Sequence, residues 1–147
     1  SWSRGLGDVY KRQALDTMHI LARKIECSEG YIVPAIDARR DEIYFAMFQS
    51  NNCKIPELKV KTDTMILSSD SFSNYYETST VNFVGDCNKK IMQYLNHENI
   101  FFSDYILPSA NEMGILSHSK YIKNQFVDVA EFQPKYLKEF GGKKINN

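Results

Sequence analysis

The sequence predicts an α/β domain in which helices flank a mixed sheet, and three observations support this fold class. Two apolar runs, residues 31–36 and 43–48, are separated by a six-residue link in which all but Ala38 are charged, a pattern typical of a buried antiparallel hairpin. An alternating segment, residues 58–61, follows where a third strand would complete a meander. Helix-like segments and short apolar runs then alternate. The expected order is helix, three-strand meander, helix, strand, helix, short strand, helix.

The first expected helix spans residues 17–28. Asp16 can accept a backbone hydrogen bond as its N-cap, and Gly30 is a natural stop. Its apolar residues recur at helical spacing and form one face: Met18, Leu21, Ala22 and Ile25. In the hairpin that follows, Pro34 has no backbone N–H to donate. We therefore expect part of that strand to lie at an edge or a bulge.

The second half of the chain carries shorter elements. In order, they are a helix over residues 69–76, a strand over 81–84, a helix over 88–96, a brief strand at 106–107, and a last helix ending near 124. Ser109 and Glu112 have the spacing of a capping box at the start of that last helix. Its inward face is expected to carry Met113, Leu116 and Tyr121.

Composition excludes several function classes. The 147 residues include 18 Lys and Arg and 18 Asp and Glu, so no strong basic field attracts nucleic acid. No apolar run is long enough to span a membrane. The three cysteines, Cys27, Cys53 and Cys87, have neither a metal-binding nor a disulfide pattern, which favours a reduced, cytoplasmic protein. The three histidines are far apart and lack metallopeptidase spacing, so we expect no metal and no cofactor.

The polar link of the hairpin is the first candidate site. It places Asp37, Asp41 and Glu42 beside Arg39 and Arg40. Paired carboxylates can perform acid–base chemistry where they converge in a cleft. Here two neutralising arginines stand in the same tight turn, and no histidine or serine is near. We therefore favour a solvated or self-paired tip, with Asp37 bonded to the N–H groups of its own turn.

Two further segments each allow two readings. Gly85 and Asp86 lie at a strand-to-helix junction, where backbone N–H groups could bind an anion. A phosphate site usually needs more glycines or a P-loop lysine, so we favour a structural turn with Asp86 as N-cap. Basic and aromatic residues alternate in the tail: Lys135, Tyr136, Lys138, Phe140, Lys143 and Lys144. This tail could touch RNA, but a solvated terminus that packs its aromatic rings is favoured.

Residues 1–13 have no apolar period and none of the features of a signal peptide. Their letters resemble a sequencing adaptor translated in frame with the gene. We therefore expect a non-native, disordered leader over residues 1–13 and a single α/β domain over residues 14–147.

Five segments together resemble a known family. They are Thr17–Ala22, Pro34–Tyr44, Asn82–Asp86, Pro108–Gly114 and Pro134–Lys138. In this order they resemble the second half of the bacterial tRNA threonylcarbamoyladenosine biosynthesis proteins called TsaB or YeaZ. The resemblance implies the ribonuclease-H-like lobe of the actin-like ATPase fold. The first lobe of such proteins has no counterpart in this sequence, so we expect the first helix to leave part of its apolar face exposed.

The resemblance implies a non-catalytic partner of a TsaD-like catalytic subunit and a TsaE-like ATPase. That complex makes N6-threonylcarbamoyladenosine beside the tRNA anticodon, and this chain would reach tRNA only through it. No catalytic, cofactor or metal residue is implied; Asp37, Arg39, Gly85 and Asp86 are motif positions expected to be structural. Proteins of this family sometimes carry an old peptidase M22 label, but this sequence has no residues that support peptidase activity. The resemblance also leaves a homodimer as an alternative.

Two other function classes remain. The alternative is a truncated nucleotide-handling enzyme of the actin-like ATPase superfamily, either a kinase or a TsaD-like paralogue. Such an enzyme needs phosphate and metal ligands, and residues 14–147 carry no motif for them. An independent RNA-binding module is disfavoured by the near-zero net charge.

Overall fold

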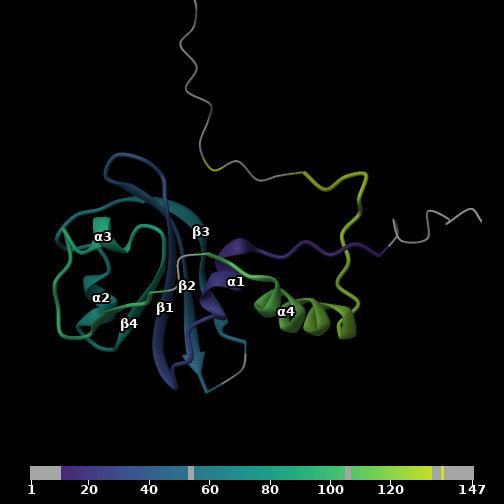
Figure 1. The fold of residues 1–147 in the computed structure, drawn as a ribbon, viewed down its shortest axis with the longest axis horizontal. Coiled ribbons are helices and arrows are strands. Elements are labelled where there is room, and N and C mark those ends of the chain that lie inside the picture. The colour runs from purple at the N-terminus through teal and green to yellow at the C-terminus, as the bar shows by residue number, and fades with distance from the viewer. Residues whose placement is uncertain (1–10, 53–54, 105–106, 134–136, 138–147) are drawn as a thin grey trace, which may run out of the picture.

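The computed structural model describes residues 11–52, 55–104, 107–133 and 137. The elements are α1 (Thr17–Ala22), β1 (Glu29–Asp37), β2 (Glu42–Asn51), β3 (Glu57–Ile66), α2 (Ser73–Tyr76), β4 (Val81–Gly85), α3 (Asn88–Ile91), β5 (Ile100–Phe102) and α4 (Ala110–Ile122). This is the predicted order of helices and strands. In Figure 1, α2 and α3 lie on one side of the sheet, whereas α1 and α4 lie on the other.

The five strands form one mixed sheet in the order β3-β2-β1-β4-β5. β1, β2 and β3 are an antiparallel meander, and β4 and β5 run parallel to β1. The parallel strands are reached through the helical segments that contain α2 and α3, as parallel connections require. The predicted mixed sheet with a meander and flanking helices is confirmed.

The hairpin of β1 and β2 is buried on both faces, as predicted. Alternate residues point to opposite sides, so the two strands feed two separate cores. The core beneath α2 and α3 contains Val33, Phe45 and Phe83, among others. The core beneath α1 contains Ile32 and Phe48 with its helix residues. Apolar residues on both faces are what a central strand covered by two helical layers requires.

The first helix is shorter than predicted and is covered. Met18 N donates to Asp16 Oδ1 at 2.8 Å, so the predicted N-cap is confirmed. The helix ends at Ala22, not at residue 28, and Gly30 belongs to β1, where its φ is +99°. The expected exposed apolar face is wrong, because Leu21 is 1% exposed and packs against the sheet.

Pro34 lies in a central strand, so its expected edge position is wrong. It pairs with Val84 of β4, and β1 pairs with β2 on both sides of it. The register with β2 is the same before and after the proline, from the pair Ile32–Phe48 to the pair Ala35–Phe45. A ladder that resumes on both sides tolerates the one missing donor.

The brief strand of the second half lies earlier than predicted. β5 is formed by Ile100–Phe102 and extends the sheet beside β4. In the predicted strand, Ile106 lies outside the described residues, and Leu107 is in no strand and is 68% exposed. Three residues are too few to show the alternation that identifies a strand. α2 and α3 are also shorter than the predicted helices, with four residues each.

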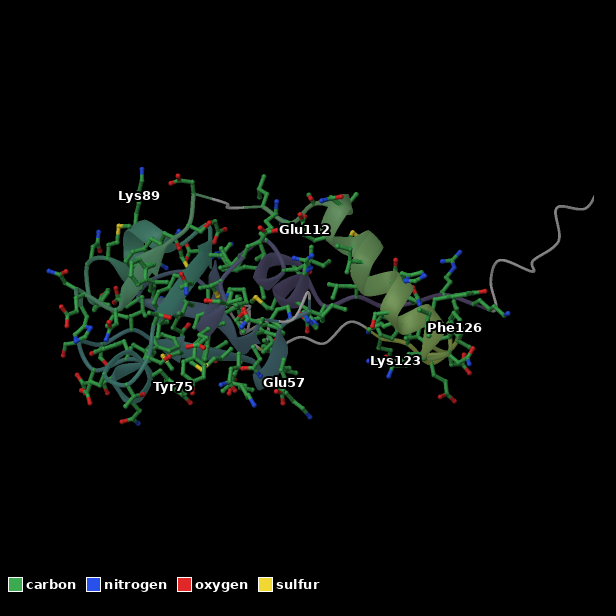
Figure 2. The ribbon with its side chains drawn as sticks, turned by 90° about the horizontal axis from the view of Figure 1, so that it is seen from below. Glu57, Tyr75, Lys89, Glu112, Lys123 and Phe126 are labelled. Atoms are coloured by element: carbon green, nitrogen blue, oxygen red, sulfur yellow. The ribbon has the colours of Figure 1, made fainter. Side chains whose placement is uncertain are left out.

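α4 extends away from the sheet, with Glu112 at its near end and Lys123 at its far end (Figure 2). Leu116 is buried as predicted, but Met113 and Tyr121 are 42% and 59% exposed, so their inward placement is wrong. Among the described helices and strands, its main neighbour is α1, which is too short to cover it.

The ends of the described region meet beside α4. Arg12 pairs with Val127, and Gln13 Nε2 donates to Ser117 O at 3.0 Å. The first ten residues of the expected leader lie outside the described residues, as do all six residues named above for the basic and aromatic tail. The predicted capping box is not formed: the Ser109 hydroxyl donates to Glu112 Oε2, and no backbone N–H of α4 donates to the Ser109 side chain.

Candidate functional site

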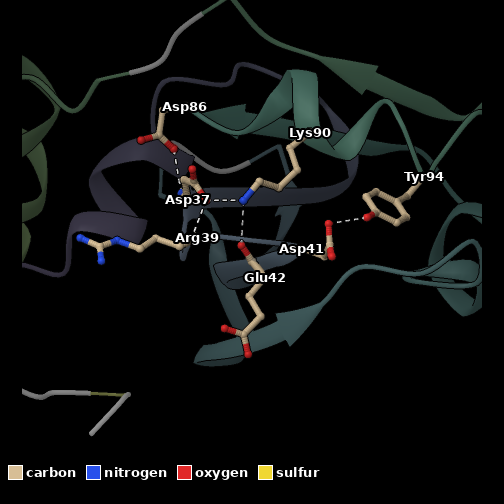
Figure 3. A network of polar contacts seen from close by, with 7 residues as sticks. All are labelled: Asp37, Arg39, Asp41, Glu42, Asp86, Lys90 and Tyr94. Carbon is tan, nitrogen blue, oxygen red and sulfur yellow. Dashed lines mark hydrogen bonds and ion pairs between the residues drawn. The ribbon is translucent and has the colours of Figure 1, made fainter. Parts of the chain in front are cut away.

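The candidate site lies where the parallel strands β1 and β4 end. Open α/β sheets bind ligands at the carboxyl ends of their parallel strands. β1 ends at Asp37 and β4 ends at Gly85, which Asp86 follows. Figure 3 shows how the hairpin tip meets this edge. The fold therefore brings the motif positions Asp37 and Arg39 close to Gly85 and Asp86. In the sequence, the two pairs lie nearly fifty residues apart.

Asp37 is the centre of a polar network (Figure 3). Its backbone N–H donates to Asp86 Oδ1 at 2.9 Å, and its Oδ1 accepts from Arg39 N at 2.8 Å. The second bond confirms that Asp37 bonds to its own turn. Lys90 Nζ donates to the same Oδ1 and, at 3.2 Å, to the backbone oxygen of Glu42. One lysine thus bridges both strands of the hairpin.

Asp41 ties the other side of the tip to the same segment. Its Oδ1 accepts a 2.7 Å hydrogen bond from Tyr94 Oη, three residues after α3 ends. Its backbone oxygen accepts from Leu67 N at 2.8 Å, just beyond β3. Together with Lys90, these bonds hold the tip from several sides, so it is a braced turn.

The network shifts the protonation of its members in definite directions. The hydrogen bond from Lys90, and then that from the Arg39 N–H, lower the pKa of Asp37. The bond to Asp41 raises the pKa of Tyr94. Burial, and next the charge of Asp86, raise the pKa of Cys87 to about 12, so this thiol is not a nucleophile near neutral pH. Because its pKa is lowered, Asp37 is a stably ionised carboxylate. A general acid needs a raised pKa instead.

Gly85 and Asp86 have different roles at the junction between β4 and α3. Gly85 has a φ of +139°, and a Cβ there would lie 1.9 Å from Ala35 O, so no other residue fits without displacement. The predicted capping by Asp86 is wrong: Cys87 occupies the N-cap position of α3, with no side-chain cap. The Asp86 carboxylate instead accepts from the backbone of Asp37 on the neighbouring strand.

The other candidate residues are not gathered. His19 lies on α1, His97 follows α3 and His118 lies on α4. Across the described ranges, no group of three His, Cys, Asp or Glu residues could hold a metal ion. Cys27 and Cys87 are free, and Cys53 lies outside the described residues.

Sequence reasoning missed Lys90 and Tyr94. They are four residues apart on the predicted helix of residues 88–96, a spacing that places two side chains on one side. This spacing is the one feature of the sequence that pairs these two residues. Nothing local indicates that this side meets the hairpin tip, because Lys90 and Asp37 are 53 positions apart.

A separate pocket of about 480 Å³ lies between the end of α1 and the start of α4. It is lined by Arg23, Lys24, Ile25, Glu26, Asn111, Glu112 and Ile115. Lys24 Nζ and Glu112 Oε2 are 3.7 Å apart. The charged residues of the lining are two of each sign, so the pocket has no net preference for an anion or a cation.

Asp37→Asn is expected to flatten the acid limb of the stability curve. Because the pKa of Asp37 is lowered on folding, its contribution is complete above its ordinary value of 3.8 and is lost as pH falls through the folded-state pKa. The Asp37 side chain is 50% exposed, so we expect a difference of no more than about 1 kcal/mol. Urea unfolding at about pH 6 and about pH 3 measures it.

The control for this prediction is Asp104→Asn, which removes an exposed carboxylate that makes no hydrogen bond or ion pair in the described part of the chain. The Asp37 variant should be the less stable of the two near neutral pH, and the gap should close in acid. An equal pH dependence of the two variants would mean that the Asp37–Lys90 pair does not stabilise the fold.

The comparisons with known proteins agree with the architecture. No protein-family model matches the sequence, and no curated protein sequence does. None of the helices in the described ranges is long and apolar enough to span a membrane. Two solved structures do match the fold.

The first is an uncharacterized protein with similarity to peptidase YeaZ from Pseudomonas aeruginosa, at TM-score 0.71 and 18% identity over 87% of this chain. The second is YeaZ from Pseudomonas aeruginosa, at TM-score 0.64 and 19% identity over 86% of this chain. This chain spans 59% of the length of each. The likeness establishes the fold: a mixed sheet with flanking helices of the ribonuclease-H-like, actin-like type.

Proposed function

We propose that this chain is the second lobe of a TsaB-like protein and acts in the cytoplasm as a non-catalytic partner subunit. The complex would contain a TsaD-like catalytic subunit and a TsaE-like ATPase, and would make N6-threonylcarbamoyladenosine in tRNA. The observation that carries the proposal is the fold likeness to the YeaZ structure and to the YeaZ-like structure over 86–87% of this chain. The order of the family-like segments in the sequence adds to it.

The polar network supports the non-catalytic part of the proposal. The carboxylates that an enzyme would use at the strand ends are bonded within the protein, Asp37 to Lys90 and Asp41 to Tyr94. A metal ion would have to displace Lys90 from Asp37, and a phosphate group would have to compete with the Asp37 carboxylate for that lysine. Their best-supported role is to hold the hairpin tip.

The surface of α4 supports the partner part. The helix exposes Ile115, Tyr121 and Ile122 at 37%, 59% and 65%, while Lys120 donates inward to Ala14 O. An exposed apolar face whose charged neighbour turns toward the body is typical of a surface that another polypeptide covers.

A nucleotide-handling enzyme is the second candidate. It is favoured by the position of Asp37 and Asp86 at the carboxyl ends of adjacent parallel strands, where actin-like folds can bind a ligand. Titration calorimetry with Mg-ATP distinguishes the two candidates. Binding and turnover by this chain alone would replace the partner-subunit proposal.

The test of the proposal is reconstitution. The chain, and any longer product of the same gene, is combined with the TsaD-like and TsaE-like proteins of the same genome. Co-purification with the TsaD-like protein and formation of the modified nucleoside in digested tRNA are the expected results. A complete complex in which omission of this chain leaves the yield of modified nucleoside unchanged would overturn the proposal.

A further inference from the structure

The tip of the hairpin carries two consecutive residues in a left-handed conformation. Arg39 has a φ of +70° and Arg40 a φ of +50°. Side chains with a Cβ rarely adopt this region, and glycine or asparagine usually fills such positions in turns. Residues held in sparsely populated backbone regions cluster at functional sites, so this arginine pair is a candidate for a functional role.

The polar network fixes the backbone that carries these arginines. Lys90 holds Asp37 before the turn and the Glu42 backbone after it, while Tyr94 and Leu67 hold Asp41. A charged side chain on a fixed backbone loses less entropy when it binds a partner. These hydrogen bonds therefore hold the backbone of Arg39 and Arg40 in a fixed position.

The two guanidinium groups are available to an outside ligand. Both residues are exposed, and neither makes an ion pair within the described ranges. Figure 3 shows the Arg39 side chain extending away from the network. The nearest carboxylates in the turn do not hold these guanidinium groups, because Asp37 is paired with Lys90 and Asp41 accepts from Tyr94.

We propose that Arg39 and Arg40 form an anion-binding tip that contacts the phosphodiester backbone of an RNA. The inference rests on the proposed function, which supplies a tRNA as the substrate of the complex. It replaces the expectation that this chain reaches tRNA only through its partners with a direct contact. A guanidinium group can bind a phosphate through two parallel N–H···O hydrogen bonds, and it keeps its charge at any physiological pH. On a chain of zero net charge, two such groups give a local contact and no general coating of nucleic acid.

The test uses the double variant Arg39→Gly/Arg40→Gly. Glycine removes both guanidinium groups and also relieves the strained backbone, so RNA affinity should fall while thermal stability stays equal or rises. Fluorescence anisotropy with an unmodified tRNA transcript, with the chain alone and in the complex, measures the affinity. Each arginine should contribute on the order of tenfold near 0.1 M salt, and the salt slope should fall by about 1 for each.

The matched control is Lys61→Gln/Lys123→Gln, which removes two exposed charges from β3 and from the far end of α4. A second tip variant, Arg39→Asn/Arg40→Asn, keeps a residue type that tolerates the left-handed region in case the glycine variant misfolds. Both tip variants should bind the tRNA transcript more weakly than the control does.

Equal RNA affinity of the tip and control variants would overturn the inference. If the tip variants instead lose the TsaD-like protein and keep RNA affinity, the tip binds carboxylates of a protein, and the RNA contact is wrong. Omission of the chain without effect on tRNA modification refutes the proposed function separately, because RNA binding by the chain is measured without that activity.

Discussion

Gly85→Ala is expected to prevent folding or to lower the free energy of unfolding by roughly 3–5 kcal/mol. The residue ends the central parallel strand β4 with a φ of +139°, and an added Cβ would lie 1.9 Å from Ala35 O. That oxygen belongs to the backbone of β1, which β2 and β4 hold from both sides, so it cannot move away alone. Urea unfolding and the thermal midpoint measure the loss.

Gly114→Ala is the control, because it makes the same chemical change in open space. A Cβ at Gly114 would meet nothing within 4 Å apart from the backbone of its own helix, and the residue lies in the interior of α4. Alanine is favoured over glycine in a helix by about 1 kcal/mol, so this variant should be more stable than the parent. Two variants of similar stability would mean that β4 does not approach β1 as closely as the structure has it.

The middle of the fold could be predicted because its information is local. Residues 31–36 and 43–48 are apolar on both faces, and a short polar link between two such runs leaves few alternatives to a buried hairpin. Asp16 and Asp37 were also predicted correctly in their local bonds. In each case the partner lies two residues away, within the reach of sequence reasoning.

The errors have a different physical cause, which is the presence or absence of distant residues that the local sequence does not reveal. Asp86 was expected to cap the helix that follows it, but the Asp37 N–H on the next strand takes its carboxylate. Part of the apolar face of α1 is expected from the sequence to be exposed, but this face packs against Phe48 and Val84. The helical period alone predicts that Tyr121 lies inward, but among the described elements the main neighbour of α4 is the short α1, and Tyr121 is exposed.

In the candidate site, too, the local features could be predicted and the contacts between distant residues could not. The composition of the turn, with its two arginines, could be read directly, and it favours a solvated or self-paired tip. The brace could not be predicted, since Lys90 and Tyr94 each reach their carboxylates across 53 positions. The left-handed backbone of Arg39 and Arg40 was equally hidden, because arginine is not a residue that signals positive φ.

Phe83→Ala is expected to cost about 3–5 kcal/mol of unfolding free energy. Phe83 is fully buried in β4, and its ring meets Phe72 edge-on at 5.3 Å and stacks on Phe102 at 5.5 Å. It therefore joins the α2 segment to the edge strand β5, and its loss leaves a cavity between them. Phe101→Ala, at a neighbouring residue that is 50% exposed, should change stability by only about 0.5 kcal/mol. Urea unfolding of both variants measures the contrast, and similar losses would mean that β5 does not close this core.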